Sequence, residues 1–187
     1  MNFLTLLQQQ VHQLHGQIRS LLQSDQGQST LNPLALTQYQ QLLCANLAYH
    51  RALETALSQQ AAYLPGYDQL LQCRTPYLVA DLLATGAPIP PQYPSYLSSW
   101  SSWKLMGAAY VGEGLSTEAQ DVVEALQQSP LVPPMARISR FFSMPLTSER
   151  MAAYVTDRAE GHEQEVIQGV QEAVILYGDL THDPALR

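Results

Sequence analysis

The chain has 187 residues and a formal net charge of −7, and only 13% of its residues are charged, about half the usual share. Lys104 is the only lysine, so the clustered cations of a nucleic-acid binder or a membrane-surface protein are missing. No stretch approaches the roughly 20 apolar residues of a membrane-spanning helix, and the first residues lack the basic flank of a signal peptide. We therefore expect a cytoplasmic protein with no nucleic-acid and no membrane partner, folded as a single domain over residues 1–187.

Apolar residues spaced by three and four predict helices in the first half of the chain. The first helix is expected over residues 2–24 and the second over 35–62, and a shorter helix over 67–85 is interrupted by Pro76 and has Gly86 as its C-cap. The apolar stripe of the first helix consists of Leu4, Leu7, Val11, Leu14, Ile18, Leu21 and Leu22. That of the second consists of Tyr39, Leu42, Leu43, Leu47, Leu53 and Leu57.

The second half is predicted to be helical as well. Residues 87–95 hold four prolines and form a stiff connector, after which one long helix is expected over 96–128. A short helix over 135–142 and a last helix over 148–180, with Thr147 as its N-cap, complete the chain. The buried face of the last helix is expected to hold Val155, Ala159, Val166, Val170, Val174 and Tyr177. Because no alternating apolar and polar run occurs, the predicted fold is all-α, a helical bundle of five to seven helices.

Two features of this pattern are candidates for chemistry. His12 and His15 share a face of the first helix, either as an exposed pair or, for His15, as an axial ligand of haem iron. Gly107, Gly112 and Gly114 fall within eight residues of one helix, where each costs about 1 kcal/mol relative to alanine. These glycines allow either a flat ligand or a neighbouring helix to come close to the helix backbone.

The histidines and carboxylates further along the chain suggest a different site. His50 and Glu54 are four residues apart and His162 and Glu165 are three apart, with Glu160 and Glu163 beside the second pair. Carboxylates and histidines at such spacings hold two irons in some helical bundles, although those bundles carry the order Glu-x-x-His. The two cysteines, Cys44 and Cys73, form no metal motif and are expected to be small buried side chains.

Four blocks of the sequence resemble the bacterial haem oxygenases, an all-α family that produces biliverdin. Residues 11–18 resemble the first helix of that family, and residues 33–54 resemble its second. Residues 106–114 resemble its kinked distal helix, where a tyrosine precedes Glu-Gly, and residues 165–177 resemble its last helix. The blocks span nearly the whole chain in the family's order, so we expect the haem-oxygenase-like fold.

The resemblance implies an enzyme for which haem is both cofactor and substrate. His15 would ligate the iron, and Tyr110, Gly112, Gly114 and Ser116 would belong to the distal, catalytic side. Arg19 and Tyr177 would contact the haem, with Arg137 or Arg140 as other cations for its propionates. Haem and O2 would give biliverdin, iron and carbon monoxide, with electrons from an external ferredoxin or reductase. Two alternatives are a protein of the same fold that binds haem, a bilin or another small ligand without turnover, and a di-iron oxygenase.

Overall fold

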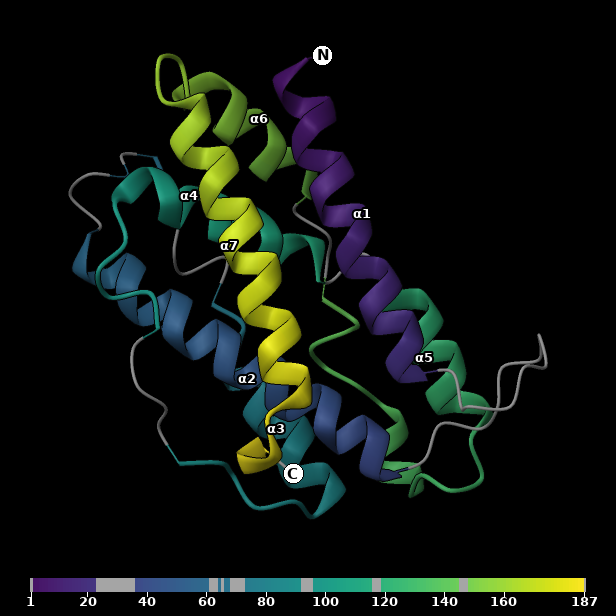
Figure 1. Ribbon diagram of the computed structural model, residues 1–187. Coiled ribbons are helices and arrows are strands. Elements are labelled where there is room, and N and C mark those ends of the chain that lie inside the picture. Colours follow the sequence, from purple (N-terminus) through teal and green to yellow (C-terminus); the bar gives the residue numbers. More distant parts are fainter. Residues whose placement is uncertain are drawn as a thin grey trace.

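The computed structural model describes residues 2–22, 36–60, 64, 66–67, 73–91, 96–115, 119–144 and 148–186. These residues form seven α-helices and two short 3-10 helices without a β-strand, which confirms the expected all-α class for this part of the chain. The α-helices are α1 Phe3–Leu22, α2 Leu36–Gln59, α3 Thr75–Thr85, α4 Ser102–Gly114, α5 Ala119–Gln128, α6 Ser148–Arg158 and α7 Glu163–His182 (Figure 1). The 3-10 helices are η2 Pro134–Arg137 and η3 Pro184–Leu186.

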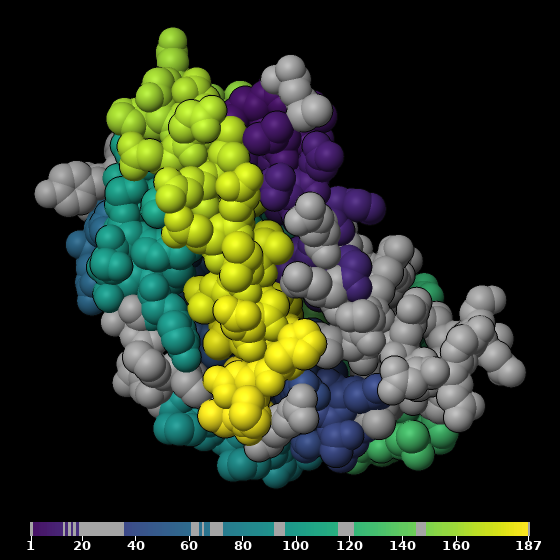
Figure 2. Space-filling view, in the orientation of Figure 1, coloured from purple at the N-terminus to yellow at the C-terminus, as the bar shows by residue number. Residues whose placement is uncertain are grey.

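Helix α7 makes many of the helix–helix contacts in the bundle. It packs against α4, α1 and α2, while α2 also packs against α3 and α4. In the space-filling view α7 runs down one face of the molecule with α4 on one side and α1 on the other (Figure 2). At the C-terminal end, η3 returns to α2.

Helix α2 lies in the middle of the core. Its predicted apolar stripe is buried, and so is every residue from Leu42 to His50, on all sides of the helix. A helix that is covered all round must have neighbours on every face, which are here α3, α4 and α7. The predicted buried face of the last helix is also confirmed, since all six of its residues are buried.

Two predicted helices are each divided in the structure. The expected helix over 148–180 ends at Arg158 as α6 and restarts at Glu163 as α7. Gly161 adopts a positive φ of 79° in the turn between them, a conformation that favours glycine and cannot continue a helix. The prediction of one helix over 96–128 was also wrong, because this range holds the two helices α4 and α5. Helix α4 begins at Ser102, directly after Ser101, whose hydroxyl accepts a hydrogen bond from the Lys104 amide. It ends at Gly114.

Helix α3 is shorter than predicted because Pro76 starts the helix and does not interrupt it. The proline occupies the first turn, where its missing N–H is not needed, and the helix begins at Thr75. Gly86 is its C-cap with φ 75°, as predicted. The short helix expected over 135–142 is reduced to η2, and the expected N-cap Thr147 lies outside the described residues.

Candidate functional site

Helix α4 carries the three clustered glycines, and each one faces a different neighbouring helix. A Cβ built on Gly107 would come within 2.8 Å of the Val170 nitrogen in α7. One built on Gly169 of α7 would come within 2.7 Å of the Lys104 Cα. The backbones of α4 and α7 therefore touch at this crossing, so close helix packing accounts for Gly107.

The other two glycines face α2 and α1. A Cβ on Gly112 would lie 3.3 Å from Cε1 of His50 and 3.2 Å from Cδ2 of Leu53. A Cβ on Gly114 would lie 2.6 Å from Cγ1 of Val11 in α1. Because α4 touches a helix on each of three sides, all its residues from Leu105 to Gly114 are buried.

The contact of Gly114 with Val11 brings the C-terminal end of α4 against α1. His15 follows Val11 by four residues in the same helix, one turn further along. The side chains of His15 and Arg19 lie outside the described residues, as does Ser116, so the structure places only the α1 backbone that carries the first two. His12, the neighbour of His15, is exposed.

Tyr110 and Tyr177, the two tyrosines among the predicted site residues, lie in the core. Burial raises the pKa of Tyr110, so its hydroxyl remains protonated at neutral pH. The hydroxyl oxygen of Tyr177 accepts a hydrogen bond of 3.0 Å from Asn46 Nδ2, and its ring meets the edge of Tyr49 at 5.9 Å between centroids. Tyr49 in turn donates to the carbonyl of Ala108 at 2.7 Å, so these groups join α2, α4 and α7.

A buried ion pair that the sequence did not reveal fixes the end of α4. Nη2 of Arg74 lies 3.0 and 2.9 Å from the two carboxylate oxygens of Glu113, and the two side chains are only 1% and 5% exposed. The one available signal was Glu113 itself, a carboxylate near the end of the apolar stretch that begins at Leu105. Nothing in the local sequence of Arg74 marks it as a core residue.

Glu54 organises the start of α3 next to this pair. Its Oε1 accepts hydrogen bonds from the amides of Arg74 and Thr75 at 2.7 and 3.0 Å. Its Oε2 accepts one from the Cys73 thiol at 3.2 Å. Burial, followed by this carboxylate, raises the pKa of Cys73 to about 11, so the thiol remains protonated. The expectation that both cysteines are buried is confirmed for Cys44 and wrong for Cys73, which is half-buried and hydrogen-bonded.

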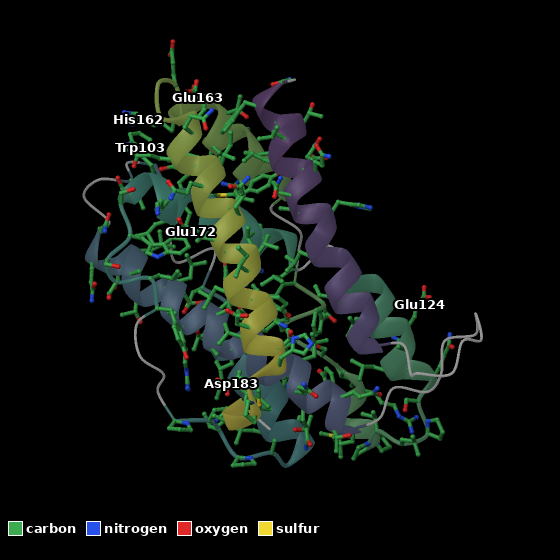
Figure 3. All side chains as sticks on the ribbon, in the orientation of Figure 1. Trp103, Glu124, His162, Glu163, Glu172 and Asp183 are labelled. Carbon is green, nitrogen blue, oxygen red and sulfur yellow. The ribbon has the colours of Figure 1, made fainter. Side chains whose placement is uncertain are left out.

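The residues of the di-iron hypothesis are not brought together. His50 is buried in the core, and burial, followed by the charge of Arg74, lowers its pKa to about 3. His162 lies at the start of α7, where its ring stacks on Trp103 with 4.1 Å between centroids (Figure 3). Among the described residues no group of three histidines, cysteines or carboxylates can hold a metal ion, and His50, Glu54 and His162 are all within them. The di-iron hypothesis is therefore not carried further.

The two arginines considered as alternatives to Arg19 are engaged elsewhere. Nε of Arg137 donates to the Val132 carbonyl at 2.8 Å. Nη1 of Arg140 lies 3.6 Å from the carboxylate of Asp81. The first contact lies within the segment around η2 and the second joins that segment to α3, and in sequence Arg19 is the one arginine or lysine of α1.

No protein-family model matches the chain, and no curated protein matches it. Within the described part of the chain, none of the helices combines the length and the apolar character needed to cross a bilayer.

Proposed function

We propose that this protein is a haem oxygenase that binds haem beside the contact of α1 with the C-terminal end of α4, with His15 as the iron ligand. The contact between Gly114 and Val11 supports the proposal, because it brings the glycine-rich end of α4 against α1 one turn before His15. The resemblance of four sequence blocks to the bacterial haem oxygenases supports it independently.

The residue types on this part of α1 fit haem. A neutral imidazole is a common axial ligand of haem iron. Leu14 and Ile18 on either side of His15 are fully buried, so this stretch of α1 adjoins apolar surroundings that suit a porphyrin. Arg19, one turn beyond His15, offers a cation for a propionate.

Within this proposal the chain binds the haem, orients it and holds protons near it. Bound haem supplies the iron at which O2 is activated and is also the molecule that is oxidised to biliverdin, with electrons from a ferredoxin or reductase. Gly114 leaves the face of the distal helix next to α1 without a side chain, whereas Gly112 faces α2, and Ser116 provides a hydroxyl just beyond the end of the helix. The ion pair of Arg74 with Glu113 stabilises the end of α4 that faces α1.

Titration with hemin tests the binding step. Purified protein should develop a Soret band at one hemin per chain, and His15→Ala should weaken binding at least tenfold and alter the spectrum. The matched control is His12→Ala, which removes an exposed histidine from the same helix and should bind hemin as the parent does. Absence of specific binding, or equal losses in both variants, would overturn the role of His15.

Turnover separates an oxygenase from a protein of the same fold that only binds haem. The hemin complex, supplied with oxygen and either ferredoxin and its reductase or ascorbate, should lose its Soret band as the absorption of biliverdin rises. A stable complex that yields no biliverdin would contradict the oxygenase and leave haem binding without turnover.

A further inference from the structure

A cavity of about 450 Å³ lies on the opposite side of α2 from α4, between α2, the proline-rich segment 87–91 and η3. Helix α2 contributes its wall residues at a spacing of three and four, which places them on one face: Thr37, Gln40, Gln41 and Cys44. This volume is within the range of small-molecule sites. None of the described residues that line it belongs to α1 or α4, so the cavity is separate from the proposed haem site.

Side-chain hydrogen bonds hold the walls of this cavity in place. Nε2 of Gln40 donates to the carbonyl of Thr85 at 3.3 Å, which ties α2 to the end of α3. Nε2 of Gln41 donates to the carbonyl of Thr181 at 2.7 Å, which ties α2 to the end of α7. The guanidinium of Arg51 donates to the carbonyl of Pro90 at 3.0 Å and fixes the proline-rich segment. A ligand would therefore enter a cavity that is already formed, which lowers the cost of binding.

The walls offer more hydrogen-bond acceptors than donors. Prolines have no backbone N–H, so Pro88, Pro90 and Pro91 present only carbonyl groups. Gln40 and Gln41 each use one amide N–H within the protein, and their side-chain oxygens can accept hydrogen bonds. No described lining residue is an acid or a base other than the Cys44 thiol, whose pKa is raised by burial, so the lining is uncharged at neutral pH.

We propose that this cavity is a binding site for a neutral, mainly apolar small molecule that donates hydrogen bonds through N–H or O–H groups. The absence of charge among the described lining residues disfavours ions, because their desolvation would not be compensated. The surplus of acceptors favours a ligand that brings its own donors. The site is independent of the haem proposal and stands if that proposal fails.

The probe for the first test is N-phenyl-1-naphthylamine, a neutral aromatic amine with one N–H whose fluorescence rises in apolar surroundings. It should bind saturably at one site per chain. Thr37→Trp and Ala185→Trp enlarge two exposed residues at the rim, and each should weaken binding at least tenfold. The matched control is Ala153→Trp, on an exposed position of α6 that does not line the cavity, and it should leave binding unchanged.

Two analogues of the probe test the chemistry of the site. The N-methylated analogue lacks the N–H and should bind about fivefold more weakly, as expected for one lost hydrogen bond of about 1 kcal/mol. The sulfonated analogue, 8-anilinonaphthalene-1-sulfonate, carries a negative charge and should compete at least tenfold less well. Equal binding of all three compounds would overturn the proposed specificity, and binding that neither rim variant weakens would overturn the site.

The rate of alkylation of Cys44 reports whether the cavity is occupied, because this residue lines its wall. Saturating N-phenyl-1-naphthylamine should slow the reaction of Cys44 with N-ethylmaleimide at least fivefold. Peptide mass spectrometry distinguishes this cysteine from Cys73, which lies beside Glu54 and should react at an unchanged rate. Equal protection of the two cysteines, or of neither, would contradict binding in this cavity.

Discussion

Arg74 and Glu113 form an ion pair inside the core, with one guanidinium nitrogen between both carboxylate oxygens. The same guanidinium contacts Met144 Sδ through Nη1 at 3.1 Å, so one side chain joins the start of α3, the end of α4 and the segment before α6. Removal of water from two charges is costly, and a buried pair remains favourable only while both partners are present.

Replacement of one partner of this pair should destabilise the protein strongly. Arg74→Met leaves the Glu113 carboxylate buried without its cation and should lower the free energy of unfolding by about 3–5 kcal/mol. Urea denaturation followed by circular dichroism measures this change. The double variant Arg74→Met/Glu113→Leu removes both charges and should be more stable than Arg74→Met alone. If the double variant lost as much free energy of unfolding as Arg74→Met and Glu113→Leu lose together, the two residues would not act as a pair.

The crossing of α4 and α7 should not tolerate a single methyl group. Gly107→Ala or Gly169→Ala places a Cβ against backbone atoms, which cannot move aside as a flexible side chain can. Overpacking of this kind costs about 1–3 kcal/mol and outweighs the better helix propensity of alanine. Thermal and urea unfolding should show the loss.

Gly16 offers the matched control for these alanine substitutions. It lies within α1, is exposed, and has nothing within 4 Å of the position of an added Cβ. Gly16→Ala should therefore stabilise the protein by up to about 1 kcal/mol. Stabilisation by Gly107→Ala as well would mean that the two helices do not touch at the crossing.

His50 should make the protein sensitive to mild acid. Its pKa is about 3 in the folded protein because burial disfavours the imidazolium, against an ordinary value of 6.5 in the unfolded chain. As the pH falls from 6.5 towards 3, the His50 imidazole therefore takes up a proton in the unfolded state but not in the folded state. The contribution of neutral His50 is therefore complete above about pH 6.5 and is lost as the pH falls toward 3, at about 1.4 kcal/mol per pH unit.

Comparison with His50→Gln isolates this contribution, since the other titrating groups are common to both proteins. The difference in free energy of unfolding between parent and variant should shrink by about 1.4 kcal/mol per unit between pH 6 and pH 4.5. Parallel curves over that range would show that His50 titrates normally in the folded protein.

Asp81 should be important for the connection between α3 and the segment after η2. Its carboxylate accepts hydrogen bonds from the Ser139 hydroxyl at 2.7 Å and from the amides of Arg140 and Phe141 at 2.8 and 2.9 Å. Asp81→Ala leaves these buried donors without their acceptor and should cost about 3 kcal/mol in urea denaturation. Asp81→Asn retains one acceptor oxygen and should cost less. Equal stability of Asp81→Ala and Asp81→Asn would contradict this role of the carboxylate.

Spacing of apolar residues predicts the helices and their buried faces well, because burial on one face is a property of the local sequence. The stripe through Leu7, Val11, Leu14 and Ile18 is buried as the periodicity predicts. The break at Gly161 was missed because the apolar period continues from Val155 to Val166 across the turn. A positive φ depends on how the chain must reverse between two packed helices, which periodicity does not encode.

The candidate site was predictable only in part. The glycine cluster signals a close approach, but the sequence cannot tell which helix approaches, and the structure shows a different one at Gly107, Gly112 and Gly114. Arg74 was unpredictable because a core position for an arginine depends on a distant carboxylate, here Glu113, which lies 39 residues away in the chain.

The close crossing at Gly107 and Gly169 also affects the two helices of the proposed haem site. Helix α1 packs on the same α7 that α4 touches backbone to backbone, so α7 supports both helices of that site. A substitution at the crossing that tilts α4 would move this helix relative to α1 without altering any residue of the proposed haem site. The affinity of the proposed haem site would therefore depend on the thickness of a helix contact that lies away from it.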